Sequence, residues 1–389
     1  MPAGQTGLER SALVVLLLFI AALPISIAAS QILLTLSIGL WLGVLITHRE
    51  RPRVPRFFWP LLAYALLTLL SVAASLDPAA SLADSKEVLL FLVVPVVYRL
   101  ARGRAASTAA TVIVSAGAAT AVYGVVQYGI LGYDDLQQRP PGFMGHYMTY
   151  SGLLMLVLVL AVARLLFDTR DRAWTGLVLP ALAVALMTTF TRGAWIGAGV
   201  GGTLLLSMKN VRLLAFLPIL AIILVAVAPA SIAERFDSIF DRRDPTSRDR
   251  IAMARAGLKM VADHPLTGVG PDMVQVVYPR YRGPDAVNEN NPHLHNVPLQ
   301  IAAERGLPAL AVWIWFVVAT IRELVARFRQ PASRALAAAG LAAVVSMLTA
   351  GAFEYNFGDS EFLMLLLVLL TLPSAVAAQR IQPQPDTPG

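Results

Sequence analysis

The chain has 389 residues, of which 57% are hydrophobic and only 14% are charged, and its mean hydropathy is +0.66. This composition excludes a soluble globular protein, because a soluble domain cannot carry so much apolar sequence. The formal net charge of +7 is no sign of nucleic-acid binding, since in a membrane protein the positions of the basic residues matter more than their sum. The absence of cysteine excludes disulfides, thiolate zinc sites and cysteine nucleophiles.

Apolar segments near the roughly 20 residues needed to cross a hydrocarbon core recur along the chain. We expect an all-α integral membrane protein of about twelve transmembrane helices, at residues 11–29, 31–47, 57–75, 87–101, 106–130, 147–166, 174–190, 193–208, 211–229, 307–326, 333–352 and 361–378. The first segment resembles a signal peptide in its apolar character. Gln31 opens another apolar run almost at once, which favours a retained helix.

The connections between these segments predict the orientation of the chain. With the N-terminus in the cytoplasm, every cytoplasmic connection carries Arg or Lys, whereas short external connections carry acidic residues such as Asp77 and Glu354. This distribution obeys the positive-inside rule. We therefore predict a bacterial inner (cytoplasmic) membrane protein with both termini cytoplasmic. Its parts are nine helices in 1–229, a periplasmic loop domain in 230–306, three helices in 307–378 and a cytoplasmic tail in 379–389.

A few basic residues depart from this pattern because they face outward. Arg192 stands in a tight connection between two apolar segments, within Thr-Phe-Thr-Arg-Gly-Ala-Trp. An ionisable side chain at such a place is costly unless it is paired or used, so we interpret Arg192 as functional. Arg139 and Arg250 are also external, and for them a plain surface charge is the alternative.

Residues 230–306 form the one long predicted connection, and long ordered loops on a rigid scaffold often carry function. Apolar residues recur there at helical spacing, at Ile251, Ala254, Leu258 and Val261. This spacing predicts an amphipathic helix over 250–263, on or near the membrane surface, with Ser247 as its N-cap. A stretch containing His293, His295 and Asn296 then leads into the next membrane segment.

The predicted topology brings three external regions to one face: Arg139 with His146, the Arg192 connection, and the long loop with Arg250 and the two histidines. Guanidinium groups bind phosphate oxygens in pairs and stay charged in any environment, so several of them suit a diphosphate. Histidine adds proton transfer near neutral pH. Beside a lipid phase, this combination indicates a polyprenyl diphosphate substrate.

Four motifs occur in order along this face. They are Arg139-Pro-Pro-Gly142 with His146, Thr191-Arg-Gly-Ala-Trp195, Asp249-Arg250 with His264-Pro-Leu-Thr-Gly-Val-Gly270, and His293-Leu-His-Asn296 with Glu304 and Gly306. Over residues 120–310 their order and spacing resemble the O-antigen ligase and O-antigen polymerase superfamily, and more closely its ligase branch. Ala254 departs from the resemblance, since the family commonly has Trp there.

The resemblance implies about twelve transmembrane helices and glycosyl transfer at the periplasmic face without metal or cofactor. It implies an undecaprenyl-diphosphate-linked glycan as donor and, in the ligases, lipid A core oligosaccharide as acceptor. It places His295 as general base, with His293 as the alternative base. Arg192 and Arg250, then Arg139, are the candidates for binding the diphosphate; Asn296, Glu304 and His146 are supporting residues.

Other functions remain as alternatives. An O-antigen polymerase or a protein O-oligosaccharyltransferase would use the same donor and differ in the acceptor. A lipid or sugar transporter is the rival from another class. Carriers usually place ionisable residues at mid-membrane depth and show internal repeats, and the sequence has neither feature.

Overall fold

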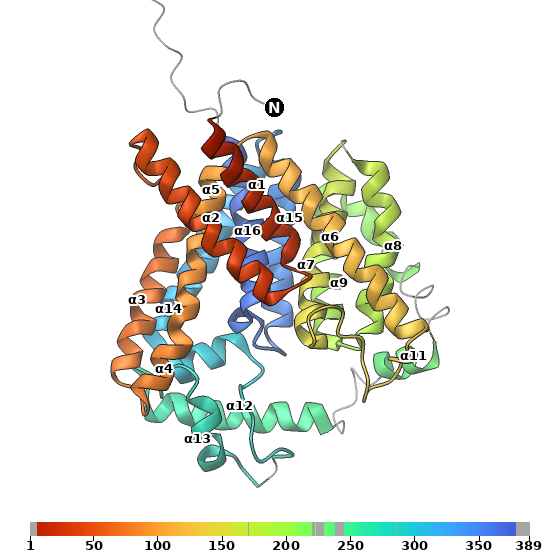
Figure 1. Ribbon diagram of the computed structural model, residues 1–389. Helices are drawn as coiled ribbons and strands as arrows, with labels where there is room; N and C mark the ends of the chain where they lie inside the picture. The colour runs from red at the N-terminus through yellow and green to blue at the C-terminus, as the bar shows by residue number, and fades with distance from the viewer. Residues whose placement is uncertain are drawn as a thin grey trace, which may run out of the picture.

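The computed structural model describes residues 6–169, 171–219, 222, 229–237, 245–284 and 286–378. Every regular element in these ranges is helical (Figure 1). The elements are α1 Gly7–Ala22, α2 Ile27–His48, α3 Phe58–Ala73, α4 Pro78–Asp84, η1 Ser85–Leu92, α5 Val93–Leu100, α6 Arg104–Gly129, α7 Tyr147–Phe167, α8 Arg172–Thr188, α9 Arg192–Lys209, η2 Val211–Phe216, α11 Ala230–Asp237, α12 Pro245–Asp263, α13 Val274–Tyr281, α14 Val297–Phe328, α15 Arg334–Ala350, η3 Asn356–Gly358 and α16 Ser360–Ala378.

The helices bear out the prediction of an all-α membrane protein. Five described helices are long and apolar enough to cross a bilayer, namely α2, α6, α7, α14 and α16. Three shorter apolar helices, α3, α8 and α15, accompany them. The total of twelve spans stays a prediction, because length and composition identify these helices and no others among the described residues.

Two predicted segments are divided by proline. The predicted segment 11–29 stops at Ala22 in the structure, and α2 begins at Ile27 after Pro24. Proline lacks the N–H that a continuing helix needs and disfavours helix in the residue before it. The segment 87–101 is a 3₁₀ helix followed by α5, in which Pro95 lies in the first turn. Pro95 cannot donate to the Phe91 carbonyl, so the α-helical hydrogen bond is missing at the junction of these two helices.

Two predictions fall partly or wholly outside the described residues. The helix expected over 211–229 begins as the 3₁₀ helix η2, and residues 220, 221 and 223–228 lie outside the described ranges. The predicted cytoplasmic tail 379–389 lies outside them as well.

The centre of the bundle is built from α7, α15 and α16, which pack on one another, and α7 and α15 also pack on α9. Small residues allow α9 and α15 to approach closely: a Cβ added at Gly201 would lie 2.2 Å from Ser346 Oγ, and that hydroxyl donates to the Gly197 carbonyl at 2.8 Å. Close contact through small residues is a usual way for membrane helices to pack. This close packing holds α9, whose first residue is Arg192, against α15.

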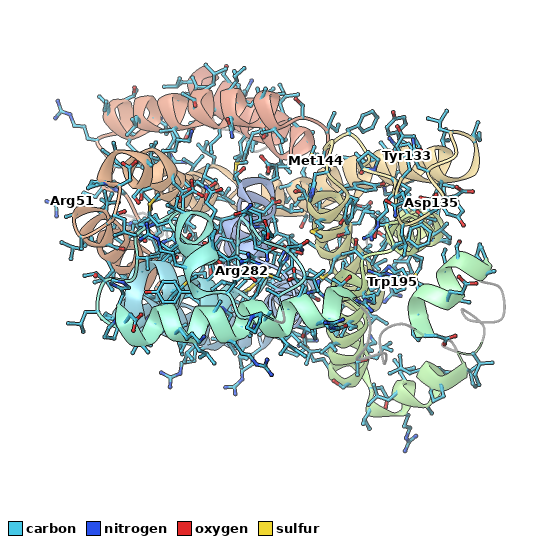
Figure 2. The ribbon with its side chains drawn as sticks, turned by 90° about the horizontal axis from the view of Figure 1, so that it is seen from below. Arg51, Tyr133, Asp135, Met144, Trp195 and Arg282 are labelled. Atoms are coloured by element: carbon cyan, nitrogen blue, oxygen red, sulfur yellow. The ribbon has the colours of Figure 1, made fainter. Side chains whose placement is uncertain are left out.

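α12 lies across the end of the bundle opposite the N-terminus (Figure 1), and the view from below shows it crossing that face (Figure 2). It packs on α13 and α14 around a second apolar core, made of Met253, Ala256, Met260, Val269, Met273, Val274, Val277, Tyr278, Leu294 and Ala303. The external segment therefore has a core of its own beneath the membrane bundle.

The predicted amphipathic helix over 250–263 is confirmed as a helix, α12, and its place on or near the membrane surface stays a prediction. Its apolar residues lie on two faces. Ile251 and Leu258 are 49% and 63% exposed, whereas the buried positions are Ala252, Met253, Ala256 and Met260. Flexible methionine side chains fill this irregular contact, which leaves the branched residues outside. The predicted N-cap is wrong, because α12 begins at Pro245 and Ser247 lies inside it. Proline suits the first helical position, where its missing N–H has no partner to lose.

The segment His264–Gly270 docks on α14 at a kink. Gly306 has φ +80°, which divides α14 at the boundary predicted between the external loop and the next membrane helix. The Val269 and Gly270 amides donate to the carbonyls of Ala303 and Glu304 at 2.9 and 3.0 Å. A Cβ at Gly306 would lie 2.2 Å from the Leu266 oxygen. Glycine is therefore required here by both the backbone angle and the close approach.

Candidate functional site

Arg192 is the first residue of α9, and its side chain is only 6% exposed. The turn before it is tight: Phe190 has φ +54°, a conformation that is strained for a bulky residue and is often found at functional sites. The first N–H groups of a helix lack acceptors within the helix, so this end also favours an anion. The short connection thus presents one guanidinium and a helix N-terminus together.

Four arginines line one cavity of about 130 Å³, here called the arginine cavity: Arg139, Arg192, Arg235 and Arg250. They come from the connection before α7 and from α9, α11 and α12, which are far apart in the sequence. The first turn of α9, from Thr191 to Ala194, lines the same cavity. The three arginines chosen from the sequence therefore meet, and Arg235 joins them.

Arg139 is placed by the loop between α6 and α7. Gly142 has φ +59°, and its amide donates to the Gln127 side chain at 2.9 Å, which ties the loop to α6. The Arg139 guanidinium lies 4.4 Å from the centre of the Tyr147 ring, a cation–π contact. Burial lowers the pKa of Arg139; Tyr147 opposes this effect and the charge of Arg192 adds to it.

The other two arginines come from α11 and α12. Arg235 is 9% exposed, and its Nε donates to the Phe190 carbonyl at 3.3 Å, so it contacts the strained turn. The Arg250 guanidinium lies 5.8 Å from the centre of the Phe353 ring. Several fixed positive charges in one partly buried cavity repel one another, and a bound anion would offset that repulsion.

A second cavity of about 240 Å³, here called the histidine cavity, adjoins the first. His146, His293 and Asp359 are among the residues that line it. The two cavities share four lining residues, Met148, Gly152, Glu354 and Asn356. A molecule that bridges the shared wall would touch arginine on one side and histidine on the other.

Glu354, at the turn after α15, holds two imidazoles. Its Oε1 lies 3.1 Å from Nε2 of His293 and 3.0 Å from Nδ1 of His295. His295 has φ +49°, and the two rings lie 4.3 Å apart. Burial alone would raise the pKa of Glu354, but the hydrogen bonds and charges of the two histidines outweigh it and hold that pKa well below its usual range. The carboxylate is therefore charged at neutral pH.

A carboxylate can only accept hydrogen bonds, so the facing nitrogens of His293 and His295 both carry a proton. In neutral His295 this leaves Nε2 with a lone pair. The arrangement is that of a carboxylate orienting a histidine base. His293 lines the histidine cavity, whereas His295 is not among the lining residues of either cavity.

The residues predicted to support His295 have other partners in the structure. Asn296 caps α14 by accepting from the Leu299 amide at 2.9 Å, and its amide donates to the Ala352 carbonyl. Glu304 accepts from Arg305, which also faces Asp84 at 3.7 Å. His146 stacks on Tyr147 with 5.1 Å between ring centres and lines the histidine cavity.

Glu354 and Arg235 line the arginine cavity but are not among the site residues predicted from the sequence. Glu354 was read only as an acidic residue of an external connection, and its partners are 59 and 61 residues away in the chain. Arg235 is an outward-facing basic residue in the long segment, the same signal that selected Arg192 and Arg250. If every arginine in the connections predicted to be external were selected by this criterion, Arg235 would be among them.

Asp249 connects the two halves of the site. It is 4% exposed and accepts from the amides of Val287 and Asn288, both at 3.1 Å. It also accepts from the side chains of Asn288 and Asn291 at 2.6 and 3.4 Å. The residue beside it, Arg250, is thereby fixed relative to the segment that leads to the histidines.

Part of the chain that forms this site is similar to a known protein family. Residues 177–314 match the family described as O-antigen ligase. The matched stretch contains Arg192, Arg235, Arg250, His293 and His295. A search of curated proteins found no match. Together with the apolar helices, the family match indicates a multi-pass bacterial membrane protein. The resemblance to the O-antigen ligase family seen in the sequence is thus confirmed over residues 177–314.

Proposed function

We propose that this protein transfers a glycan from undecaprenyl diphosphate to lipid A core oligosaccharide at the periplasmic face of the inner membrane. The observation that carries the proposal is the shared wall between the arginine cavity and the histidine cavity, where Glu354 stands. Glycosyl transfer from a diphosphate needs a cation-lined pocket for the leaving group and a base close to it. The adjoining cavities supply both.

The arginine cavity receives the donor's diphosphate. As the glycosidic bond breaks, negative charge collects on the leaving phosphate, and fixed guanidinium groups stabilise that charge more than the ground state. Arg192 and Arg250 are the principal cations, with Arg139 and Arg235 beside them. Their planar groups bind phosphate oxygens in pairs and need no metal ion to neutralise the charge.

The histidine cavity receives the acceptor. A sugar hydroxyl attacks the anomeric carbon of the donor glycan, a C–O bond forms, and the bond from that carbon to the diphosphate oxygen breaks. The hydroxyl proton passes to a histidine that Glu354 holds. His295, oriented through Nδ1, is the base that the sequence predicts, although it does not itself line the cavity. His293, which bonds to the same carboxylate and lines the cavity, is the alternative base.

The position of the site supports a periplasmic reaction. Both cavities are formed with α12 or the turn after α15, at the end of the bundle opposite the N-terminus (Figure 1). With the N-terminus cytoplasmic, as the basic connections predict, this end faces the periplasm.

One assay tests the proposed function and the two alternative functions that use the same donor. Purified protein is incubated in EDTA with undecaprenyl-diphosphate glycan and, separately, lipid A core, a second lipid-linked glycan, or a pilin-like protein. We expect product with lipid A core only. Product with the second lipid-linked glycan would instead assign a polymerase, and product with protein an O-oligosaccharyltransferase.

Two further outcomes would overturn the proposed chemistry. Activity that appears only after a divalent metal is added contradicts a metal-independent reaction. Movement of the intact donor across proteoliposome membranes, with no glycan transferred to any acceptor, favours the transporter.

A further inference from the structure

His293, His295 and Glu354, which supply and orient the proposed catalytic base, are also residue types that bind metal ions together. His293, His295 and Glu354 each offer one ligand atom, and these atoms lie within 4.8 Å of one another. Two imidazole nitrogens and one carboxylate oxygen are a donor set found in open zinc sites, where a fourth position is left for water. Magnesium and calcium prefer oxygen ligands, so this set selects against them.

We propose that His293, His295 and Glu354 bind a zinc-class dication, and that its binding blocks glycan transfer. The inference rests on the proposed function, in which His295 is the base and metal is not a cofactor. The ion is then an inhibitor of the same site.

The geometry is close to what such an ion requires. Glu354 Oε1 is 3.1 Å from Nε2 of His293 and 3.0 Å from Nδ1 of His295. A tetrahedral ion bound at about 2.0–2.1 Å sets its ligand atoms about 3.3 Å apart. The two distances from Glu354 Oε1 are within a few tenths of an ångström of this value, and all three ligand atoms lie within 4.8 Å of one another.

The segment that carries the histidines is held rigidly. Leu294 is 2% exposed in the second apolar core, and its amide donates to the Gln300 side chain at 2.7 Å. His295 has a left-handed backbone conformation, and its ring lies 4.3 Å from the ring of His293. A preorganised pair of ligands loses little freedom when it binds an ion.

The turn that carries Glu354 is fixed against the same segment. The Val297 amide donates to the Gly351 carbonyl at 2.7 Å, and Asn296 donates to the Ala352 carbonyl at 3.2 Å. The Tyr355 amide donates to Glu354 itself at 3.1 Å. All three ligands are thus positioned before an ion arrives.

An ion can reach the site. The side chains of His293, His295 and Glu354 are 29%, 17% and 19% exposed. His293 and Glu354 also line the histidine cavity of about 240 Å³, which leaves room for water at a fourth position. The proposed acceptor uses the same cavity, so the ion and the acceptor compete for space.

Binding would also remove the base by moving a proton. A metal takes a lone pair on Nδ1 of His295, the nitrogen that carries the proton in the metal-free protein. That proton moves to Nε2 through water, and no charge is gained or lost. Nε2 then carries a hydrogen and cannot accept the proton of the acceptor hydroxyl. The block is therefore chemical as well as steric.

A titration without substrate tests the metal site. Full-length protein is stripped with EDTA, freed of chelator, and titrated with zinc sulfate against a chromophoric zinc chelator. We expect one tight zinc ion per chain, and cobalt in its place should give the visible absorption of a four-coordinate site. His293→Ala and Glu354→Gln should each weaken zinc binding by at least about 10-fold, the loss that even an outer partner of a metal site can cause.

Matched substitutions control for folding and for stray binding. His264→Ala and Glu289→Gln replace the same residue types elsewhere in the external layer, where Glu289 faces Arg282. Both should bind zinc as the unaltered protein does, and all variants should keep its elution volume and helical circular dichroism. The metal site is wrong if the unaltered protein binds zinc no more tightly than His293→Ala, or if His264→Ala weakens binding equally.

The inhibition is measured separately in the transfer assay. Zinc should slow transfer by the unaltered protein, EDTA should restore it, and magnesium at the same concentration should have no effect. If zinc binds but does not slow transfer, the proposed inhibition is wrong. If no transfer is seen under any condition, the proposed function fails, while the titration still decides whether the metal site exists.

Discussion

At the scale of single residues, the candidate site is marked by buried arginines, because burying a charged side chain away from water is unfavourable. Arg192 and Arg235 are at most 9% exposed, and both line a cavity with two further arginines. Guanidinium groups that converge on one cavity give it a positive charge and several hydrogen-bond donors, which suits an anion. The polyanion of the proposed reaction is the diphosphate of the donor.

Replacing Arg192 tests this explanation. Arg192→Ala should lower the rate of transfer about 10²–10³-fold, the usual effect of removing one preorganised group that stabilises charge in the transition state. Arg192→Lys should retain part of the rate, because the charge stays but the paired hydrogen bonds are lost. The rate is measured with purified protein at equal concentration.

The control for Arg192 is Arg51→Ala, which changes an exposed arginine in the connection between α2 and α3. It should transfer at the unaltered rate. Equal activity of Arg192→Ala and the unaltered protein, at equal abundance, would remove Arg192 from the site.

The arginines could be predicted from the sequence and Glu354 could not. Arg139, Arg192 and Arg250 stand out locally, as basic residues on the side of the membrane that should lack them. Glu354 has an acidic character that suits an external turn, so nothing local distinguishes it. Its role depends on contacts with residues about 60 positions earlier, which only the fold creates.

At the scale of elements, α12 connects the arginine cavity to the segment that leads to His293 and His295. Arg250 lies near its start, and the adjacent Asp249 accepts four hydrogen bonds from the segment 287–291. The sequence predicted this helix but not which face it buries. Branched residues at 251 and 258 gave the stronger pattern, whereas the actual contact uses alanine and methionine.

Asp249→Ala should loosen that junction. Four donors lose a buried charged acceptor, which costs about 1–3 kcal/mol of local stability. We expect faster backbone amide hydrogen exchange at Val287 and Asn288, whose N–H groups donate to Asp249, and slower transfer, because Arg250 and the histidines are no longer held in register. Hydrogen exchange followed by mass spectrometry reports the first effect and the transfer assay the second.

Asp263→Ala is the matched change at the other end of α12. Asp263 is exposed and accepts from the Tyr281 hydroxyl at 2.9 Å, so its loss should leave exchange in 286–296 and the rate of transfer unchanged. A similar response to both substitutions would mean that Asp249 acts only through the general stability of α12.

At the scale of the whole molecule, hydropathy predicted the helical bundle because each membrane helix must satisfy its own backbone. It did not predict the divisions at Pro24 and at Pro95, which arise from single residues inside apolar runs. Nor could it predict the second apolar core, whose members are scattered from Met253 to Ala303. The orientation of the bundle in the membrane is inferred only from the Arg and Lys residues in the connections between helices.

The absence of cysteine makes that orientation directly testable, since any introduced thiol is unique. Arg51→Cys lies in the exposed connection after α2, predicted to be cytoplasmic, and Asp134→Cys in the exposed connection after α6, predicted to be periplasmic. A charged maleimide that reaches the periplasm but does not cross the inner membrane should label only the second in intact cells, and both after the membranes are permeabilised. Figure 2 places Arg51 and the labelled neighbours Tyr133 and Asp135 on separate parts of the molecule. The reverse labelling would put the arginine and histidine cavities in the cytoplasm, where a donor presented at the periplasmic face cannot reach them.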